Sequence, residues 1–442
     1  MASVIKIYAL FLGSALLMFG GGLQGLLLSV RGAEEGFSLL ALGLIGTGWS
    51  IGFVAGSITV PLVVRKVGHI RAFSVMAAIG TVTILLNLLL INDLSWIMLR
   101  ALSGFCFAGA AMIVESWLNE VAENKSRGTI FSIYVTINMA ASTLGQISMS
   151  ITGTAGYVPF VIGAISFICA VLPTALTSSP QPRPLASARI DIGLLYRTSP
   201  VAAIAAFSVG MANGAFGTLA PVYGYEQGLD ASGISLLFAV AAILGAAAQV
   251  PFGRLSDHID RRLVLIGLAG FAAIVGALTV LINPGPNWMM FVLFAAYGFA
   301  ANPIYAVAVA HANDFARDGD FAKIAGGMLL ILGLGLAIGP AVASLIMGAW
   351  SPVGLFLVTA TFHGALAITA WLRMRVRKSV DASERAPFQP MAGDRQVTPE
   401  TIELDPRTES DSTEGPMAPE APVPEELIET QEEKRDVQDG TI

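Results

Sequence analysis

Charged residues are scarce in this sequence. Asp, Glu, Lys and Arg together make up 13% of the 442 residues, whereas hydrophobic residues make up 55% and the mean hydropathy is +0.71. A soluble globular domain carries roughly 25% charged residues. Apolar stretches of about 18 or more residues recur along the chain, and each can cross the hydrocarbon core of a bilayer as a helix. The composition therefore excludes an ordinary soluble protein and predicts an all-α integral membrane protein.

Cysteine is almost absent as well. The two cysteines, Cys106 and Cys169, lie within apolar stretches, which indicates packing roles rather than a disulfide framework or a metal site. The sequence also lacks a phosphate-binding Gly-x4-Gly-Lys-Ser/Thr loop, a paired-histidine motif and an assembled set of catalytic acids and bases. We therefore predict no enzyme, no cofactor and no metal, and the lack of a basic domain argues against nucleic-acid binding.

Twelve apolar segments are predicted to cross the membrane. A polar connection at 179–198, with three prolines and three arginines, separates two sets of six. We thus expect an N-terminal half at 1–178 and a pseudo-symmetric C-terminal half at 199–378. The predicted spans are 5–30, 38–64, 72–91, 95–120, 129–153, 156–178, 199–226, 232–254, 262–283, 287–311, 322–347 and 352–373.

The positions of the bases predict the orientation of the helices. The loops on one side contain a single base, Arg31, whereas the alternate loops and the segment after the last span are rich in Arg and Lys. Base-rich loops lie on the cytoplasmic side of a membrane protein. Both termini are therefore predicted to be cytoplasmic in a bacterial inner membrane, and the first span is expected to be retained rather than cleaved as a signal peptide.

The last 64 residues, 379–442, differ from the rest of the chain. They contain 17 acidic and 5 basic residues and eight of the 22 prolines, so that their net charge is −12. A segment with few hydrophobic residues and an excess of one charge cannot bury enough apolar surface to fold alone. We predict a disordered cytoplasmic tail, which either increases solubility or docks to another surface.

A turn between the eighth and ninth spans carries the most specific motif. Residues 253–262 read GRLSDHIDRR, which resembles the cytoplasmic loop signature of the major facilitator superfamily, G-x-L-[AS]-D-R-x-G-R-[RK], with departures at positions 258 and 260. Asp257 can pair with Arg261 or Arg262, or cap a neighbouring helix, and so close the cytoplasmic face. Charges that only set the topology are the alternative. The gate candidates in this turn are Gly253, Asp257, Arg261 and Arg262.

Three more gate candidates lie at the same predicted side of the membrane. Gly68 and Arg71 belong to a degraded copy of the turn after the second span. Asp314 follows the tenth span, where a gate or a helix cap is favoured over substrate contact. Matching basic turns in the two halves are typical of transporters in which one half rocks against the other.

The fourth span contains two charged residues. Arg100 and Gly104 form the pattern Arg-x-x-x-Gly, which also resembles a superfamily signature, and Glu115 follows fifteen residues after Arg100. That spacing is about 22 Å along a helix, but it leaves the two side chains within about 60° of the same face. Both are predicted to line one central path. Glu115 is the candidate proton-coupling carboxylate, with a structural carboxylate bonded to Asn119 or a loop base as the alternative; Arg100 either steers an anionic group or tunes a proton site.

Polar residues deep within other spans are candidates for the substrate lining, although most intramembrane amides bond neighbouring helices. Gly339 and Pro340 are predicted to break the eleventh helix at a place where the freed backbone groups lie against protein or water. The candidate lining residues are Gln24, Asn138, Gln146, Asn213, Tyr223 and Asn302.

Together these motifs resemble those of the uncharacterised bacterial permeases of the YcaD type, within the major facilitator superfamily. The matching pieces are residues 114–116, 126–128 and 144–146, the 253–262 turn and Gly339-Pro340. The resemblance implies alternating access driven by an ion gradient. We therefore predict a secondary active transporter of a small organic solute, coupled to protons, with export favoured, acting as a monomer in the lipid bilayer. The alternative is a membrane receptor or scaffold that signals through the acidic tail.

Overall fold

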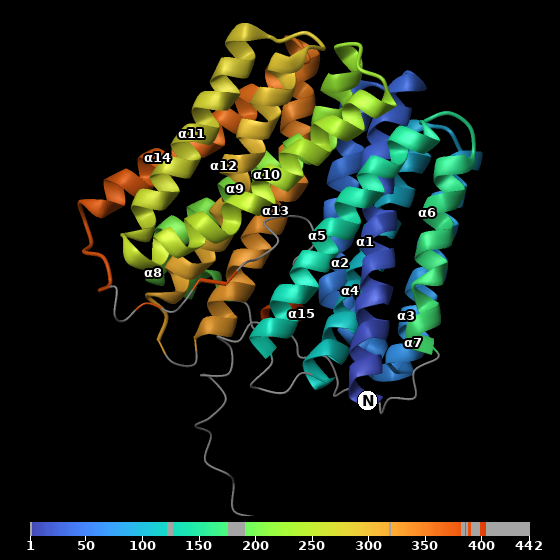
Figure 1. Ribbon diagram of the computed structural model, residues 1–442, viewed down its shortest axis with the longest axis horizontal. Helices are drawn as coiled ribbons and strands as arrows, with labels where there is room; N and C mark the ends of the chain where they lie inside the picture. Colours follow the sequence, from blue (N-terminus) through green and yellow to red (C-terminus); the bar gives the residue numbers. More distant parts are fainter. Residues whose placement is uncertain are drawn as a thin grey trace, which may run out of the picture.

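The computed structural model describes residues 2–121, 127–175, 191–317, 320–381, 385, 388–389 and 398–403, and within these ranges every regular element is a helix. The helices form two groups that lie side by side (Figure 1). The first group comprises α1 (Ala2–Glu34), α2 (Leu39–Val67), α3 (His69–Leu89), α4 (Asp93–Val121), α5 (Arg127–Thr152), α6 (Val158–Cys169) and α7 (Val171–Ala175).

The second group follows the polar connection. It comprises α8 (Ile192–Thr198), α9 (Pro200–Glu226), α10 (Ala231–His258), α11 (Arg261–Ile282), α12 (Trp288–Asn313), α13 (Phe321–Ala349) and α14 (Gly354–Met374). A short helix, α15 (Pro399–Glu403), lies in the C-terminal tail.

The predicted membrane helices are present in both groups. Eleven helices among the described residues are long and apolar enough to cross a bilayer, and the shorter apolar segment Val158–Pro173, formed by α6 and α7, stands at the predicted sixth span. Large apolar side chains such as Val82 on α3 and Ile274 on α11 are more than half exposed, as expected for helices that face lipid rather than water. The all-α membrane fold is thus confirmed.

Local sequence determines where several helices begin and end. Asp230 caps α10 by accepting a hydrogen bond from the backbone N–H of Gly233 at 2.8 Å, and Ser38 caps α2 in the same way at 3.2 Å. Gly68 connects α2 to α3 with φ +84°, a backbone conformation that favours glycine. These short connections place consecutive helices antiparallel to each other.

The two groups of helices meet at one end and diverge at the other. Ser50 donates to the carbonyl of Leu336 at 3.1 Å near the middle of α2 and α13, and Ser232 at the start of α10 donates to the carbonyl of Ser150 at 3.2 Å near the end of α5. We call the end that carries the 65–71 and 254–262 turns the basic end. The groups diverge toward the basic end, where the N-terminus also lies (Figure 1), and the Ser232–Ser150 bond lies at the opposite end.

The predicted break in the eleventh helix is wrong, because α13 continues through Pro340 from Phe321 to Ala349. Proline has no N–H, so the carbonyl four residues earlier, that of Leu336, loses its helical partner. Ser50 of α2 supplies a hydroxyl hydrogen bond to this carbonyl at 3.1 Å. Gly339 packs so closely on α9 that an added Cβ would lie 2.2 Å from the carbonyl oxygen of Met211. The Gly-Pro pair therefore allows close packing of continuous helices.

Part of the C-terminal tail departs from the predicted disorder. Helix α15 contacts both α4 of the first group and α13 of the second, and Thr398, Glu400 and Thr401 are at most 5% exposed. Hydrogen bonds to α4 provide the interactions that composition alone does not predict. Residues 382–384, 386–387, 390–397 and 404–442 of the predicted disordered tail lie outside the described residues.

We expect Gly104→Val to destabilise the protein, because α2 and α4 cross without space for a side chain. A Cβ at Gly104 would lie 2.1 Å from the carbonyl oxygen of Trp49, and overpacking of this kind costs about 1–3 kcal/mol. Thermal unfolding in detergent should show a lower Tm for Gly104→Val. Gly267→Val is the matched control, since nothing lies within 4 Å of a Cβ there; equal Tm values for both variants would contradict the packing argument.

Candidate functional site

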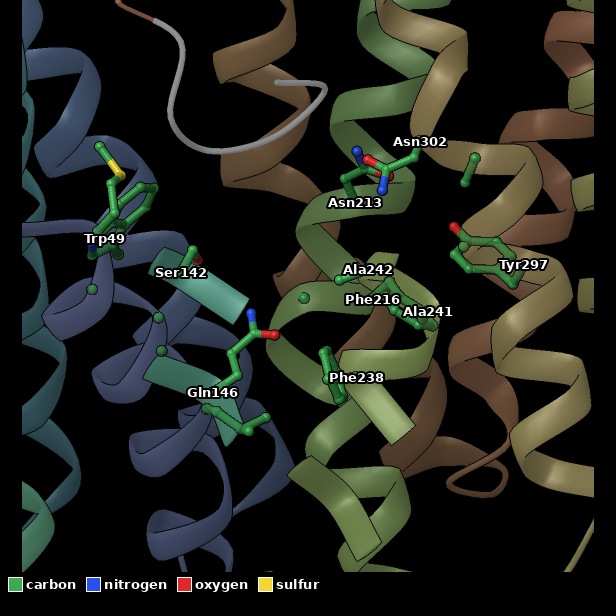
Figure 2. Close-up of a pocket in the computed structure, with 18 of the residues that line it drawn as sticks. Trp49, Ser142, Gln146, Asn213, Phe216, Phe238, Ala241, Ala242, Tyr297 and Asn302 are labelled. Carbon is green, nitrogen blue, oxygen red and sulfur yellow. The ribbon is translucent and has the colours of Figure 1, made fainter. Parts of the chain in front are cut away.

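A cavity of about 180 Å³ lies between the two groups of helices. Its walls come from α1, α2, α4 and α5 on one side and from α9, α10 and α12 on the other. Figure 2 shows Gln146 extending from α5 into this space, with Asn213, Phe216 and Tyr297 across from it. A cavity at the boundary of two similar halves is where membrane transporters bind their substrates.

Three of the predicted lining residues, Gln146, Asn213 and Asn302, line this cavity. The Oε1 atom of Gln146 is buried and accepts no hydrogen bond from the described residues. A buried amide oxygen without a partner costs free energy, so Gln146 is available to a hydrogen-bond donor on a bound molecule. These residues contribute amide groups from both sides of the cavity.

The other three predicted lining residues hold helices together instead. Asn138 accepts a hydrogen bond from Ser14 at 2.7 Å and thereby joins α5 to α1. Tyr223 is fully buried, and its hydroxyl donates to the carbonyl of Pro284 at 3.3 Å. Gln24 of α1 accepts a hydrogen bond from Arg100 of α4.

Arg100 is the only residue with a formal charge among the described residues that line the cavity. It is 4% exposed, and its guanidinium donates to Oε1 of Gln24 at 2.8 Å. Ser103 donates to the same oxygen at 3.0 Å, which holds the Gln24 amide in place. The guanidinium carbon also lies 5.6 Å from the centre of the Trp49 ring, within the range of a cation–π contact. The cavity wall therefore carries one buried and oriented positive charge.

Aromatic residues that were not predicted as lining form much of the cavity wall. The ring of Phe216 lies 4.6 Å from that of Tyr297 and 5.6 Å from that of Phe238, between ring centres. On the other side, the rings of Trp49 and Phe107 are 5.9 Å apart. An apolar residue on a membrane helix faces lipid, a neighbouring helix or a cavity with no difference in local pattern, so the sequence contains no signal that separates these cases.

Glu115 lies on α4 away from the cavity lining, toward the basic end. It is fully buried, and Tyr134 of α5 donates to its Oε1 atom at 2.7 Å. Thr401 of the tail donates to the same oxygen at 2.9 Å, and Thr398 donates to Oε2. No arginine, lysine or histidine in the described part of the chain forms an ion pair with Glu115. The predicted alternative partner, Asn119, instead donates to the carbonyl of Glu400 at 3.4 Å.

The predicted gate residues of the second half form a charged cluster at the basic end. Arg261 is buried and pairs with Asp257 at 3.0 Å and with Asp314 at 2.7 Å. Asp314 is the C-cap of α12, so this arginine ties the ends of α10, α11 and α12 together. Burial raises the pKa of Asp314, while the hydrogen bonds and charge of Arg261 act to lower it. All these contacts lie within the second group of helices.

Arg262 has a separate set of partners. It pairs with Asp260 at 2.7 Å and donates to the carbonyl of Arg377 at 2.7 Å, which joins the start of α11 to the end of α14. Burial acts to raise the pKa of Asp260, but the hydrogen bonds and charge of Arg262 outweigh burial and hold that pKa below its usual value. The departure from the superfamily motif at position 260 thus supplies a second ion pair.

The remaining gate candidates differ in their surroundings. Gly68 forms the tight connection after α2, and Arg71 is exposed. Gly253 lies under the ring of Phe388 from the tail, so that an added Cβ would come within 2.2 Å of that ring. No cluster of three or more metal-ligating side chains occurs among the described residues.

Comparison with known families decides the family of the chain. The family model described as Major Facilitator Superfamily matches residues 10–230 and 202–408. The chain belongs to the major facilitator superfamily. Curated relatives include the uncharacterised MFS-type transporter YcaD of Escherichia fergusonii, 26% identical over 333 residues that cover 74% of this chain and 85% of the relative. An uncharacterised MFS-type transporter of Enterobacter sp. (strain 638) is 25% identical over the same shares. The predicted resemblance to the YcaD type is confirmed.

Solved structures share the fold of this superfamily member. A mutant of the nucleoside transporter NupG has a TM-score of 0.70 at 13% identity and covers 83% of this chain and 99% of its own. A bacterial homologue of the human lysosomal transporter Spinster, in an inward-facing and occupied conformation, has a TM-score of 0.69 at 16% identity over 86% of this chain and 97% of its own. At these identities the likeness concerns the fold alone, which is that of the superfamily.

Proposed function

We propose that this member of the superfamily is a secondary active transporter that carries a small organic solute through the central cavity by alternating access. The observation that carries the proposal is the position of the cavity, which is lined by both halves and lies at their boundary. Rocking of one half against the other would expose such a cavity to each side of the membrane in turn. The halves contact each other at one end and diverge at the basic end, as expected for one of the two end states of that motion (Figure 1).

The solute that fits the cavity is an organic anion with an apolar or aromatic body. Arg100 contributes a positive charge, and no carboxylate is among the described lining residues. A guanidinium binds carboxylate or phosphate groups with charge-assisted hydrogen bonds. Phe216, Phe238 and Tyr297 provide an aromatic surface on the other side, and Gln146 adds an amide acceptor for a hydroxyl or amino group.

Proton coupling through Glu115 and export complete the proposal. A buried carboxylate without a cation is costly, and proton uptake removes its charge. From the positive-inside rule we infer that the basic end and both termini face the cytoplasm in a bacterial inner membrane. Export of an anion in exchange for an entering proton moves both charges down an inside-negative membrane potential, which is worth about 2.3 kcal/mol per charge per 100 mV. A monomer contains both walls of the cavity and suffices for this cycle.

Reconstitution tests the proposal directly. Liposomes that contain the purified protein are loaded with aromatic carboxylates or with their uncharged amide analogues, and a pH difference is imposed across the membrane. We expect efflux of at least one carboxylate that follows the pH difference and is absent from protein-free liposomes, together with proton entry reported by an entrapped pH dye. Equal efflux in both kinds of liposome for every carboxylate would refute transport of organic anions.

The receptor or scaffold alternative is not favoured. The family match extends over both halves, and the relatives carry the name of transporters. The described part of the tail contains one helix of five residues, which is too small to form a signalling domain.

A further inference from the structure

The carboxyl group of Glu115 binds a segment of the chain's own tail. Thr398 donates to one oxygen of this carboxyl group, and Thr401 donates to the other at 2.9 Å. The two threonines stand three residues apart, so one helical turn presents both hydroxyls on the same face. Their backbone N–H groups bond each other's hydroxyl oxygens at 2.9 and 3.3 Å. The segment is thus folded in the conformation that fits the carboxyl group.

The contact buries tail residues as deeply as residues of the helix core. Thr398 is fully buried, and Thr401 and Glu400 are 5% and 2% exposed. Asn119 of α4 donates to the carbonyl of Glu400 at 3.4 Å, and the short helix α15 also contacts α13 of the second half. The segment therefore lies between the two halves at the end where they diverge (Figure 1).

A second anchor attaches the tail to the other half. The backbone N–H of Phe388 lies 3.1 and 3.2 Å from the two carboxylate oxygens of Asp257. The Phe388 ring covers Gly253, and Arg385 donates to the carbonyl of Ile259. The motif turn of α10 and α11 thus holds one part of the tail, while α4 holds the other.

We propose that Glu115, Tyr134 and Asn119 form a binding site for a short peptide with threonines three residues apart, and that residues 398–401 are its ligand. Bound in this way, the tail bridges both halves, covers the route between the basic end and the cavity, and prevents the halves from approaching at that end. The tail is then an internal inhibitor of the cycle. The peptide-binding site does not depend on the proposed transport function, whereas inhibition rests on that function.

Thiol accessibility tests the binding without any substrate. Cys106→Ala and Cys169→Ala remove the native thiols, and Gln146→Cys places a reporter in the cavity wall of the full-length protein in detergent. A membrane-impermeant maleimide should label this reporter about tenfold faster after Thr398→Ala with Thr401→Ala, because two hydrogen bonds to a carboxyl group are lost. The matched pair Thr398→Ser with Thr401→Ser keeps both hydroxyls and should label as slowly as the parent protein.

Either of two results would overturn the proposal. Unchanged labelling after the alanine pair would mean that the two hydroxyls do not hold the segment in place. Equally fast labelling after the serine pair would mean that the hydroxyl contact is irrelevant. Size-exclusion chromatography of each variant checks that the protein remains folded. We expect no loss of folding, because Thr398 and Thr401 lie outside the membrane helices.

A peptide added in solution identifies the ligand itself. Deletion of residues 379–442 should accelerate labelling of the same reporter, and a peptide of residues 396–404 should restore slow labelling. The same peptide with Thr398→Ala and Thr401→Ala should not slow labelling. If the unsubstituted peptide also fails to slow labelling, binding by this segment is refuted. In liposomes the alanine pair should raise solute flux about tenfold; changed labelling without flux in any variant would refute transport and leave the peptide site standing.

Discussion

Glu115→Gln should abolish the dependence of solute flux on the pH gradient while exchange down the solute's own gradient continues. Glutamine keeps the size of the side chain and can still accept hydrogen bonds from Tyr134 and Thr401, but it does not take up a proton. A difference of one pH unit drives about tenfold accumulation for each coupled proton, since about 1.4 kcal/mol corresponds to tenfold. The variant should lose this factor in liposomes with an imposed pH difference.

Glu120→Gln is the control for this prediction. Glu120 lies five residues further along α4 and is exposed, whereas Glu115 is fully buried. The control variant should keep gradient-driven flux. Flux that still follows the pH gradient in Glu115→Gln would leave transport intact and assign Glu115 to tail binding and helix packing alone.

Arg100→Gln should remove the preference for anionic solutes. The charge-assisted hydrogen bonds that a guanidinium makes to a carboxylate contribute about 1.5–3 kcal/mol, or roughly 10- to 100-fold in binding. We expect the ratio of kcat/KM for an aromatic carboxylate over its amide analogue to fall by about that factor. Arg100→Lys should retain part of the preference, because an ammonium keeps the charge but lacks the planar donor pair held by Gln24.

The ratio of two solutes separates charge recognition from loss of folding. A variant that merely unfolds loses transport of the carboxylate and of the amide together, so its ratio is unchanged. Arg31→Gln serves as control, since Arg31 lies at the C-terminal end of α1, is not among the cavity-lining residues and pairs with Glu35. An unchanged ratio in Arg100→Gln would exclude Arg100 from anion recognition.

The positions of the membrane helices were predictable because the bilayer imposes the same requirement on each span separately. A run of apolar residues must form its own backbone hydrogen bonds in lipid, whichever neighbours it acquires. The predicted span 232–254 thus falls within α10, Ala231–His258, and span 352–373 matches α14, Gly354–Met374. The ion pair between Asp257 and Arg261 was also predictable from the 253–262 turn, because the two residues are only four positions apart.

The lining of the cavity was only partly predictable. Gln146 and Asn302 reach the cavity, whereas Asn138 meets Ser14 of a helix more than one hundred residues away. The same amide lines a path or joins two helices according to the rotation of its helix, and long-range packing sets that rotation. Pro340 failed as a predicted break for a similar reason, because Ser50 from another helix supplies the missing hydrogen bond.

The sequence by itself determined the membrane class, the helix spans, the two halves and the superfamily motifs, since all of these follow from composition and short spacing. Tertiary structure alone decided which residues face the cavity, that aromatic rings oppose Arg100, and that the tail reaches Glu115. Thr398 and Glu115 are 283 residues apart. Contacts of that kind depend on how separate helices pack, and no local pattern of residues encodes them.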